Sequence, residues 1–482
     1  YRPEAYKELN PENGAYYDGA IEINLDEIRP MIALPFHPSC AYTIEEVNAN
    51  LRDLLEETEK RAKVSFGDKV NYNLTNKIID GKLYIDQGVI AGCAGGGYEN
   101  ICAAADILKG KDTGNGKFLL DVYPASMPVY KALMENGAFS SLVSAGAIVK
   151  TAFCGPCFGA GDTPANGALS IRHSTRNFPN REGSTIQNGQ LASVALMDAR
   201  SIAATAANKG FLTAATDFDT EFSGKKYFFD KTIYEKRVYD SKGVAHPEVE
   251  IQFGPNIKDW PEQKALADDL LIKVVSEIHD SVTTTDELIP SGETSSFRSN
   301  PLGLAEFTLS RKDPSYVGRA KAVRDLTDDV KAEIKAAVAA LTKADAGLGA
   351  KAEKAGTGST IFAVKPGDGS AREQAASCQR VLGASANIAN EYATKRYRSN
   401  LINWGMLPFI YKDGDKNLPF ANGDYVFLPG VRKMIEDKLP SIKAYAVTAN
   451  GKVNEFELTV GDLTDDERKI ILAGCLINFN RA

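Results

Sequence analysis

The chain has 482 residues, enough for about two to four domains whose cores need no disulfide or metal to stabilise them. Hydrophobic residues make up 43% and charged residues 25%, as in soluble globular proteins, and no apolar run reaches the roughly 18 residues of a membrane-spanning helix. Lysine and arginine number 56 against 63 aspartates and glutamates. The net charge of −7 disfavours DNA, RNA or a membrane surface as the partner of the whole protein.

The cysteines are too few and too scattered for the disulfide framework of a secreted protein. They are Cys40, Cys93, Cys102, Cys154, Cys157, Cys378 and Cys475. This set indicates a reducing compartment, so we expect a cytoplasmic protein, or one of the mitochondrial matrix if the source is eukaryotic. The chain begins at Tyr1 and nothing after it resembles a signal peptide, which we interpret as a processed product or a fragment.

Residues 1–30 show no periodic pattern, and we interpret them as a connector or as the tail of a preceding domain. The prolines within residues 24–39 predict an extended connection there. A helix follows, because Thr43 and Glu46 have the spacing of a capping box. The apolar residues at helical spacing in it are Ile44, Val47, Leu51, Leu54 and Leu55.

Short apolar segments and helical patterns alternate from residue 82 onward. The predicted strands are residues 82–85, 88–90, 117–122 and 147–149. The predicted helices are residues 98–108 and an alanine-rich stretch over residues 190–209. Strands alternating with helices favour a parallel sheet, so we expect an α/β domain over residues 31–216.

The pattern weakens over residues 217–263, where prolines and scattered charges predict a linker. We expect a second α/β unit over residues 264–482. Its predicted elements are a helix over 328–343, a flexible connection over 347–358, a strand over 360–364 and a helix over 371–382.

The sharpest local motif is Cys154–Cys157, with the sequence CGPC, and three interpretations of it stay open. A thioredoxin-like redox pair should open a helix, but two glycines follow closely and disfavour one. A structural zinc site needs a second ligand pair at compact spacing, and none is obvious. The third interpretation adds Cys93, which follows the predicted strand 88–90. Loops after parallel strands meet at one sheet edge, and three thiolates there can hold three irons of a four-iron cluster.

Several stretches, in this order, resemble the aconitase superfamily, which includes aconitases, isopropylmalate isomerases and related hydratases. They are Ile21–Leu25 (IEINL), Ile90–Ile101 (IAGCAGGGYENI), Cys154–Cys157 (CGPC), Thr175–Arg181 (TRNFPNR) and Gly367–Glu373 (GDGSARE). The resemblance implies an aconitase-like α/β/α domain that carries an iron–sulfur cluster, then a linker and a swivelling β/α C-terminal domain. It is closest to the aconitase-like hydratases of bacteria.

The resemblance also implies roles for individual residues. Cys93, Cys154 and Cys157 would be the ligands of a 4Fe-4S cluster, and Ser370 would be the catalytic base. Four arginines would bind substrate carboxylates: Arg176, Arg181, Arg298 and Arg372. Asp286 and Thr175 would contact these site residues without contacting the substrate. The guanidinium group of arginine binds carboxylates bidentately, which is consistent with these roles. A structural ion pair is the alternative role for each of the four arginines.

Local patterns offer Ser370 a second role, because Glu373 three residues on predicts that Ser370 caps a helix. The chain also departs from the family at three of these positions. Ala371 stands where the family has a second serine, Thr175 where it has an asparagine, and Glu287 where it has a histidine. Glycines follow Cys93 in place of the usual polar residues. These departures weigh against citrate–isocitrate chemistry.

The resemblance implies a hydro-lyase of the EC 4.2.1 class acting on a hydroxy di- or tricarboxylic acid. Family members carry further domains that precede the position where this chain begins, so we expect an N-terminal polypeptide or missing domains as a partner. The alternative functions are a catalytically degenerate aconitase-like protein with a binding or regulatory role, and a redox enzyme that uses the CGPC pair.

Overall fold

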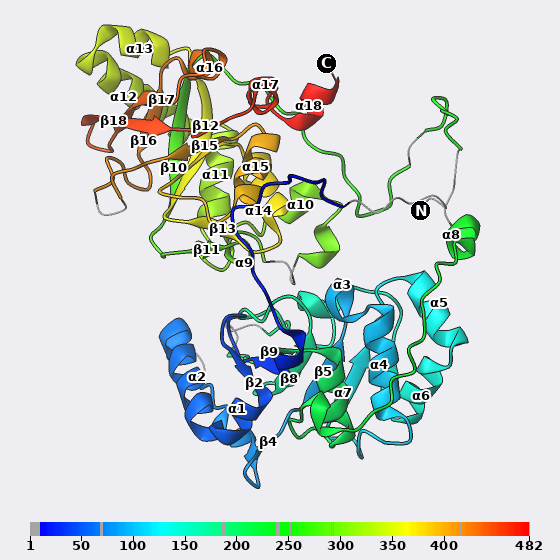
Figure 1. Ribbon diagram of the computed structural model, residues 1–482. Helices are drawn as coiled ribbons and strands as arrows, with labels where there is room; N and C mark the ends of the chain where they lie inside the picture. The colour runs from blue at the N-terminus through cyan, green and yellow to red at the C-terminus, as the bar shows by residue number, and fades with distance from the viewer. Residues whose placement is uncertain are drawn as a thin grey trace. The chain divides into compact units, whose positions relative to one another are not determined.

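The computed structural model describes residues 10–67, 71–184, 189–237, 242–250, 252–290, 292, 294–414 and 417–481 (Figure 1). Parts of two predicted segments lie outside these ranges: residues 1–9 of the predicted tail, and residues 238–241 and 251 of the predicted linker. The chain forms two compact units, Tyr1–Cys157 with Gly161–Val238, and Phe158–Ala160 with Tyr239–Ala482. No helix among the described residues is long and apolar enough to cross a lipid bilayer.

A seven-stranded sheet forms the centre of the first unit, in the order β2-β1-β9-β8-β5-β6-β7. The strands are β1 (Met31–Ala33), β2 (Ala41–Thr43), β5 (Gln87–Ile90), β6 (Leu119–Val122), β7 (Ile148–Val149), β8 (Leu169–His173) and β9 (Ser193–Met197). The strands from β5 to β9 run parallel to their neighbours in the sheet, while β1 is antiparallel to β9 and β2. The strand order reverses at β5, which lies between β8 and β6. Ligands of such sheets gather at the carboxyl ends of the strands around this switch point.

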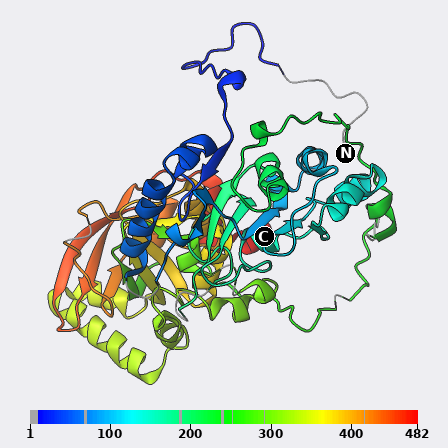
Figure 2. The same cartoon turned by 90° about the horizontal axis from the view of Figure 1, so that it is seen from below.

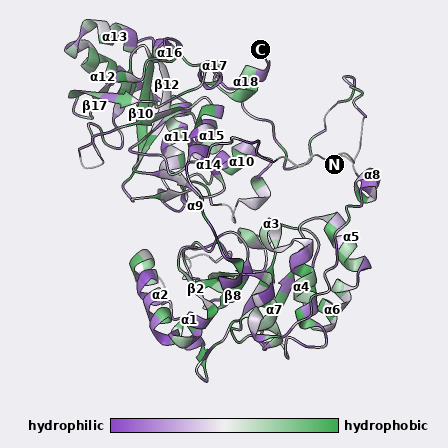
Figure 3. Cartoon of the chain, viewed as in Figure 1, coloured by the Kyte–Doolittle hydropathy of each residue, from purple (hydrophilic) through white to green (hydrophobic). Residues whose placement is uncertain are grey.

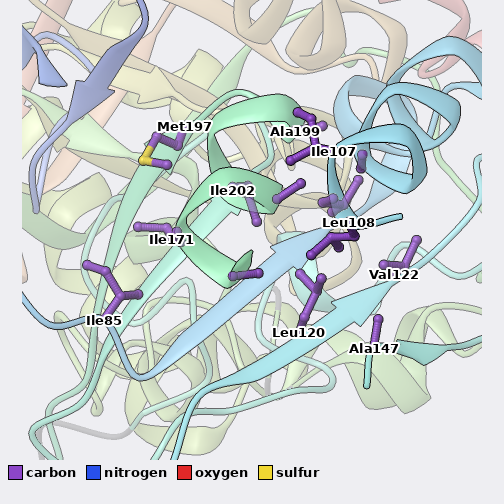
Figure 4. Packing of buried hydrophobic residues seen from close by; sticks show 14 of the residues in the cluster. Ile85, Ile107, Leu108, Leu120, Val122, Ala147, Ile171, Met197, Ala199 and Ile202 are labelled. Atoms are coloured by element: carbon purple, nitrogen blue, oxygen red, sulfur yellow. The ribbon is translucent and has the colours of Figure 1, made fainter. Parts of the chain in front are cut away.

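Helices cover this sheet and close its main hydrophobic core. They are α1 (Ile44–Ala49), α2 (Leu51–Phe66), α4 (Tyr98–Leu108), α5 (Met127–Glu135), α6 (Ala138–Ser144) and α7 (Ala199–Ala207). Figure 4 shows Ile107 and Leu108 of α4 with Ile202 of α7 beside Leu120 and Val122 of β6. The small side chains of α7 allow it to pack closely against α4.

The second unit contains a closed barrel with the strand order β10-β12-β14-β15-β18-β17-β16. The strands are β10 (Leu270–Ile278), β12 (Gly356–Ala363), β14 (Ala384–Ala389), β15 (Leu407–Ile410), β16 (Tyr425–Leu428), β17 (Ser441–Val447) and β18 (Val453–Thr459). The first four form parallel pairs and the rest pair antiparallel. β10 is hydrophobic over most of its length, because both of its faces are buried (Figure 3).

Helices pack on opposite sides of the barrel. α11 (Tyr316–Arg324), α14 (Arg372–Val381) and α15 (Lys395–Asn403) contribute to one hydrophobic cluster. α12 (Asp328–Ala344) and α13 (Ala346–Ala352) pack on β10, β16 and β17 in another, and Figure 2 shows them in yellow-green beside the orange strands. The shorter elements of this unit are β11 (Thr283–Thr284), α9 (Thr285–Leu288), α10 (Pro301–Ala305), β13 (Pro366–Asp368), α16 (Val431–Glu436), α17 (Asp465–Ala473) and α18 (Leu476–Arg481).

The predicted mixed α/β class is confirmed, and several predicted elements form as expected. The capping box of Thr43 and Glu46 is present, α4 has its predicted bounds, and α12 ends one residue beyond its prediction. The predicted helix at residue 43 is interrupted at Asn50, so that α1 and α2 follow one another. The predicted strands over 88–90, 117–122 and 147–149 correspond to β5, β6 and β7.

Three sequence predictions are wrong. The stretch 190–209 is not one helix, because β9 occupies its first part and the Asp198 side chain caps α7, which occupies the second. The predicted connection over 347–358 contains α13, which the Asp345 side chain caps. The predicted extended connector over 24–39 contains β1, because Ile32 is completely buried in the core. In each case tertiary burial or a cap decided the structure against local propensity.

Candidate functional site

Cys93 lies in the turn that leaves the carboxyl end of β5. The turn is the short helix α3 (Gly92–Gly95), in which the Cys93 side chain is exposed. Glycine is required around it: a Cβ at Gly95 would lie 2.5 Å from the carbonyl oxygen of His173, and one at Gly96 would lie 2.4 Å from that of Tyr123. Glycine at these two positions therefore lets this turn lie directly on the ends of neighbouring strands.

Cys154 and Cys157 lie in the loop that leaves the carboxyl end of β7. Gly155–Cys157 forms a single 3-10 turn, and the Cys157 amide donates to the Cys154 carbonyl over 3.1 Å. Cys157 packs against a small cluster of Val89, Ala91 and Tyr123. A Cβ at Gly92 would lie 2.7 Å from the Cys157 Sγ, so this loop reaches the turn that carries Cys93.

The three thiols interact electrostatically. None of the three is half of a disulfide in the part of the chain that the structure describes. The pKa of Cys157 lies far above its usual range, first because of its hydrogen bond with Cys154, then because of burial and the negative charges that Cys154 and Cys93 carry when ionised. A cationic metal centre removes such repulsion between thiolates, so this donor set fits an iron–sulfur cluster. Within the described ranges, however, no three His, Cys, Asp or Glu residues already form a group that could hold a metal ion.

The predicted arginines of the first unit follow the carboxyl end of β8. Arg181 is buried, and its Nη2 donates to the Cys157 carbonyl over 2.7 Å. Arg176 is half-buried, and its Nη1 lies 3.3 Å from the Oγ1 of the exposed Thr175. The structure thus brings the loops after β5, β7 and β8 to one edge of the sheet. It also gives Arg181 a structural contact with the loop that carries Cys154 and Cys157, the cysteine loop.

In the second unit, Ser370 lies in a loop braced against α9. β13 pairs with β11, and the Ala371 amide lies 3.3 Å from the Thr285 Oγ1, to which it donates. Gly369 has φ +136°, and a Cβ there would lie 2.1 Å from that same Oγ1, so glycine is required. This pairing places the Ser370 loop beside the helix that carries Asp286.

The predicted capping role of Ser370 is wrong. α14 begins at Arg372, its N-cap residue is Ala371, and no side chain caps it. The Glu373 carboxylate instead accepts a hydrogen bond from the Trp404 indole over 3.0 Å. The Ser370 side chain is exposed, so its hydroxyl is not committed to holding the helix.

A pocket of about 370 Å³ opens beside Ser370 and concentrates positive charge. Its lining includes Ser370, Arg372, Lys395 and Arg396. Burial lowers the pKa of Arg372, and the charge of Arg396 lowers it further. Among the described residues, the buried Nε of Arg372 has no hydrogen-bond partner. A cationic pocket with an unused donor is suited to a carboxylate.

Lys395 and Arg396 line this pocket, although the sequence predicted no role for them in the site. The available signal was the adjacent Thr394, whose side chain caps α15 and fixes where that helix begins. Two other residues of this unit lie apart from the pocket lining. Arg298 is exposed directly after the short helix η7 (Ser295–Phe297), and the Glu287 carboxylate completes a capping box with Thr284.

These features define a class of protein: a two-unit α/β protein that presents thiols and arginines at the carboxyl edge of one sheet, and a serine and cations beside a barrel. The chain belongs to the aconitase superfamily. The model of the aconitase family (aconitate hydratase) matches residues 2–204, and that of the aconitase C-terminal domain matches residues 321–414. The predicted family is therefore confirmed.

Curated relatives match about two fifths of this chain. The 3-isopropylmalate dehydratase large subunit of Caldicellulosiruptor bescii is 30% identical over 198 residues, which are 41% of this chain and 38% of that protein. The large subunit of Caldanaerobacter subterraneus is 32% identical over 199 residues, or 41% and 40% of the two chains. This chain thus spans about two fifths of the length of these relatives.

Solved structures also match, and one of them superposes poorly. It is a 3-isopropylmalate dehydratase (leuD) from Methanocaldococcus jannaschii, 21% identical, with a TM-score of 0.27 over 44% of this chain and 93% of that chain. This likeness is too low to bear on the site.

Proposed function

We propose that this chain supplies the cluster-bearing domain and the C-terminal domain of a 4Fe-4S-dependent hydro-lyase for a hydroxy di- or tricarboxylic acid. The proposed cluster-bearing domain spans residues 31–216, the linker residues 217–263, and the swivelling domain residues 264–482. The observation that carries the proposal is the convergence of Cys93 and the CGPC turn at the edge of a sheet, in a chain of the aconitase superfamily.

The proposed ligands of the cluster are Cys93, Cys154 and Cys157. Three thiolates leave one iron of a four-iron cluster without a protein ligand, and such an iron supplies a Lewis acid for a substrate hydroxyl. The chain's contribution is to hold the thiolates in place. Arg181 does so through the Cys157 carbonyl, and the glycines after Cys93 do so by close packing.

The remaining proposed residues bind the substrate and move its proton. The guanidinium groups of Arg176, Arg181, Arg298 and Arg372 bind substrate carboxylates, and Asp286 and Thr175 support them. Ser370 removes the carbon-bound proton through its Oγ, and the N–H groups at the start of α14 favour the alkoxide form of that oxygen. Arg372 is the best supported of the four arginines, because its pocket is cationic and its Nε is unused.

The proposed partners are a small carboxylate substrate and an N-terminal polypeptide or domain that completes the enzyme. The relatives are named as large subunits of a dehydratase, and this chain spans only part of their length. We place the complete enzyme in the cytoplasm, where thiols stay reduced.

An iron and sulfide assay on anaerobically purified protein tests the proposed cluster. We expect close to four irons and four acid-labile sulfides per chain, with broad visible absorption. Cys93→Ser and Cys154→Ser should each abolish this content, whereas Cys378→Ser, a substitution of a buried core cysteine, should not. A reconstituted chain that takes up no iron or sulfide would contradict the cluster and favour a degenerate binding protein, and cluster retention in Cys93→Ser would also contradict the assignment.

A further inference from the structure

Arg172 is a buried arginine that neither the sequence patterns nor the proposed mechanism uses. It lies on β8 with only 1% of its surface exposed, among the largest fully buried side chains of the chain. Burying a guanidinium is costly unless its donors are satisfied. The cost of burying Arg172 must therefore be offset by hydrogen bonds from its guanidinium group.

Two nitrogens of the Arg172 guanidinium group donate hydrogen bonds to backbone carbonyls of the cysteine loop. Its Nη1 donates to the Pro156 carbonyl, inside the CGPC turn, and its Nη2 donates to the Asp162 carbonyl over 2.7 Å. The same Nη2 lies 3.3 Å from the Gln87 Oε1, and the Nε donates to the Ser170 Oγ over 3.0 Å. One guanidinium thus ties two points of the cysteine loop to the adjacent strands β5 and β8.

A second set of contacts supports the same loop. The Gln87 Nε2 donates to the Asp162 carbonyl over 3.2 Å, and Lys150 forms ion pairs with the carboxylates of Asp121 and Asp162. Burial lowers the pKa of Arg172, and the charges of Glu182 and Asp162 are the largest effects that oppose this and favour its cationic form. The network holds the loop on both sides of Cys157, while Arg181 holds the Cys157 carbonyl itself.

We propose that Arg172 is a positioning residue that fixes the Cys154–Cys157 turn at the sheet edge, so that both thiols are held in place to bind a metal cluster. The cluster part of this inference rests on the proposed function, whereas the ordering of the turn does not. Arg172 acts through the Pro156 carbonyl and touches neither substrate nor reacting atoms. Its charge next to the thiolates also opposes their mutual repulsion.

Hydrogen–deuterium exchange on the full metal-free chain tests the positioning role. In Arg172→Gln we expect peptides over residues 154–162 to exchange about tenfold faster or more, because a hydrogen bond from a buried charge is lost. Peptides over β5, β6 and β9 should be unchanged. Arg172→Lys should restore part of the protection, because the ammonium can still donate to one carbonyl.

Two further variants test whether faster exchange in Arg172→Gln reflects the loss of its contacts with the cysteine loop or a general loss of stability. Gln87→Met removes the second contact to Asp162, together with the Oε1 that accepts from Ser170 and Arg172, without removing a charge. It should loosen the same peptides to a lesser degree, because Arg172 keeps its bonds to the Pro156 and Asp162 carbonyls. Arg380→Gln is the matched control, because Arg380 also donates to backbone carbonyls, those of Ala384, Lys264 and Gly474, and all of these residues belong to the second unit. It should leave the exchange of residues 154–162 unchanged.

Cluster content provides the second measurement. In Arg172→Gln we expect iron and sulfide to be lost on exposure to air at least about tenfold faster than from the unsubstituted protein. Unchanged exchange over residues 154–162 in folded Arg172→Gln would overturn the positioning role. If the unsubstituted chain binds no cluster, the proposed function fails, and the exchange experiment still decides whether Arg172 orders the turn.

Discussion

At the scale of single residues, the surroundings of Arg372 support its proposed role in binding a substrate carboxylate. It is the first residue of α14, it has an unused Nε, and it shares a pocket with Arg396, whose charge opposes its own. Two cations held close together attract a carboxylate and are stabilised by it, while the Glu373 carboxylate that also lines the pocket accepts a hydrogen bond from the Trp404 indole. The pocket therefore supports the proposed carboxylate contact of Arg372 better than the exposed position of Arg298 supports its own.

We predict that Arg372→Ala weakens binding of tricarballylate, a tricarboxylate that cannot be dehydrated, by about tenfold or more, because a charge-assisted hydrogen bond is lost. Isothermal titration calorimetry on the full chain measures this. Lys433→Ala is the control, since it removes an equal charge at an exposed position on α16 of the same unit. Equal weakening by both variants would show that only the overall charge matters.

Ser370 allows a prediction about rate. In the active, cluster-loaded enzyme with its N-terminal partner, Ser370→Ala should lower kcat by about 10²–10⁴-fold with little change in KM, as the loss of a general base does. The free energy of unfolding should hardly change, because the Ser370 side chain is exposed and does not cap α14. A destabilised variant with normal kcat would assign the serine a structural role.

The raised pKa of Cys157 predicts how metal binding depends on pH. Below its pKa this thiol must release a proton to bind a metal, so the apparent affinity for Co²⁺ should increase with pH, by about tenfold per unit for each thiol still protonated. Thiolate-to-cobalt absorption measures this between about pH 6 and 8. Cys157→Ser should reduce the slope by the contribution of one thiol, and a slope that is the same in both proteins would contradict the assignment.

At the scale of elements, the turn around α3 shows why glycines follow Cys93. A Cβ at Gly96 would lie 2.4 Å from the Tyr123 carbonyl, whereas one at Gly97 would meet only the Asn100 Nδ2 at 3.7 Å. The two positions are adjacent, and both have negative φ. They differ in the space around them, not in backbone strain.

We therefore predict that Gly96→Ala lowers the free energy of unfolding by about 1–3 kcal/mol, because the backbone of two strand-end loops must move apart. Gly97→Ala should cost less, about 0.5–1 kcal/mol, because it meets no close backbone atom and only replaces glycine by the poorer N-cap residue alanine at the start of α4. Urea unfolding of the full chain followed by circular dichroism measures both. Equal costs would mean that the loops after β5 and β6 adjust freely.

Individual elements also show which parts of the fold could be predicted from the sequence and which could not. The capping box of α1 and the bounds of α4 were predictable, because the caps and the apolar spacing lie within one short window. β9 was not, because its alanine-containing sequence has helical propensity and becomes a strand only through pairing with β8 and β1. The Ser370 cap failed for a similar reason: pairing of β13 with β11 shifts the start of α14 beyond the serine.

At the scale of the whole molecule, the two units have separate hydrophobic clusters. The first unit has its own core around the sheet, and the second has clusters on both faces of its barrel wall. On either side of the boundary between the units, residues 221–237 and 242–250 are almost entirely exposed and include α8 (Thr232–Arg237). This exposure supports the proposed linker over residues 217–263.

We predict that trypsin, at low ratio, first cuts the native chain between residues 224 and 250, where lysines and arginines are exposed and few contacts hold the backbone. Mass spectrometry of the earliest fragments locates the cut. The cut protein should keep the circular dichroism of the intact chain. First cleavage between β5 and β9 would place the weakest point inside the first unit and contradict the proposed boundary.

The sequence by itself determined the family, the α/β class and the candidate residues, because motif order, apolar spacing and caps are local properties of the chain. Tertiary structure alone decided that the Cys93 turn meets the CGPC turn, since parallel pairing brings strand ends from distant segments to one edge. It also decided the role of Arg172 and the cationic pocket of Arg372 and Arg396. A buried donor is defined by its acceptors, and those of Arg172 come from residues 87, 156, 162 and 170, which only the folded sheet brings together.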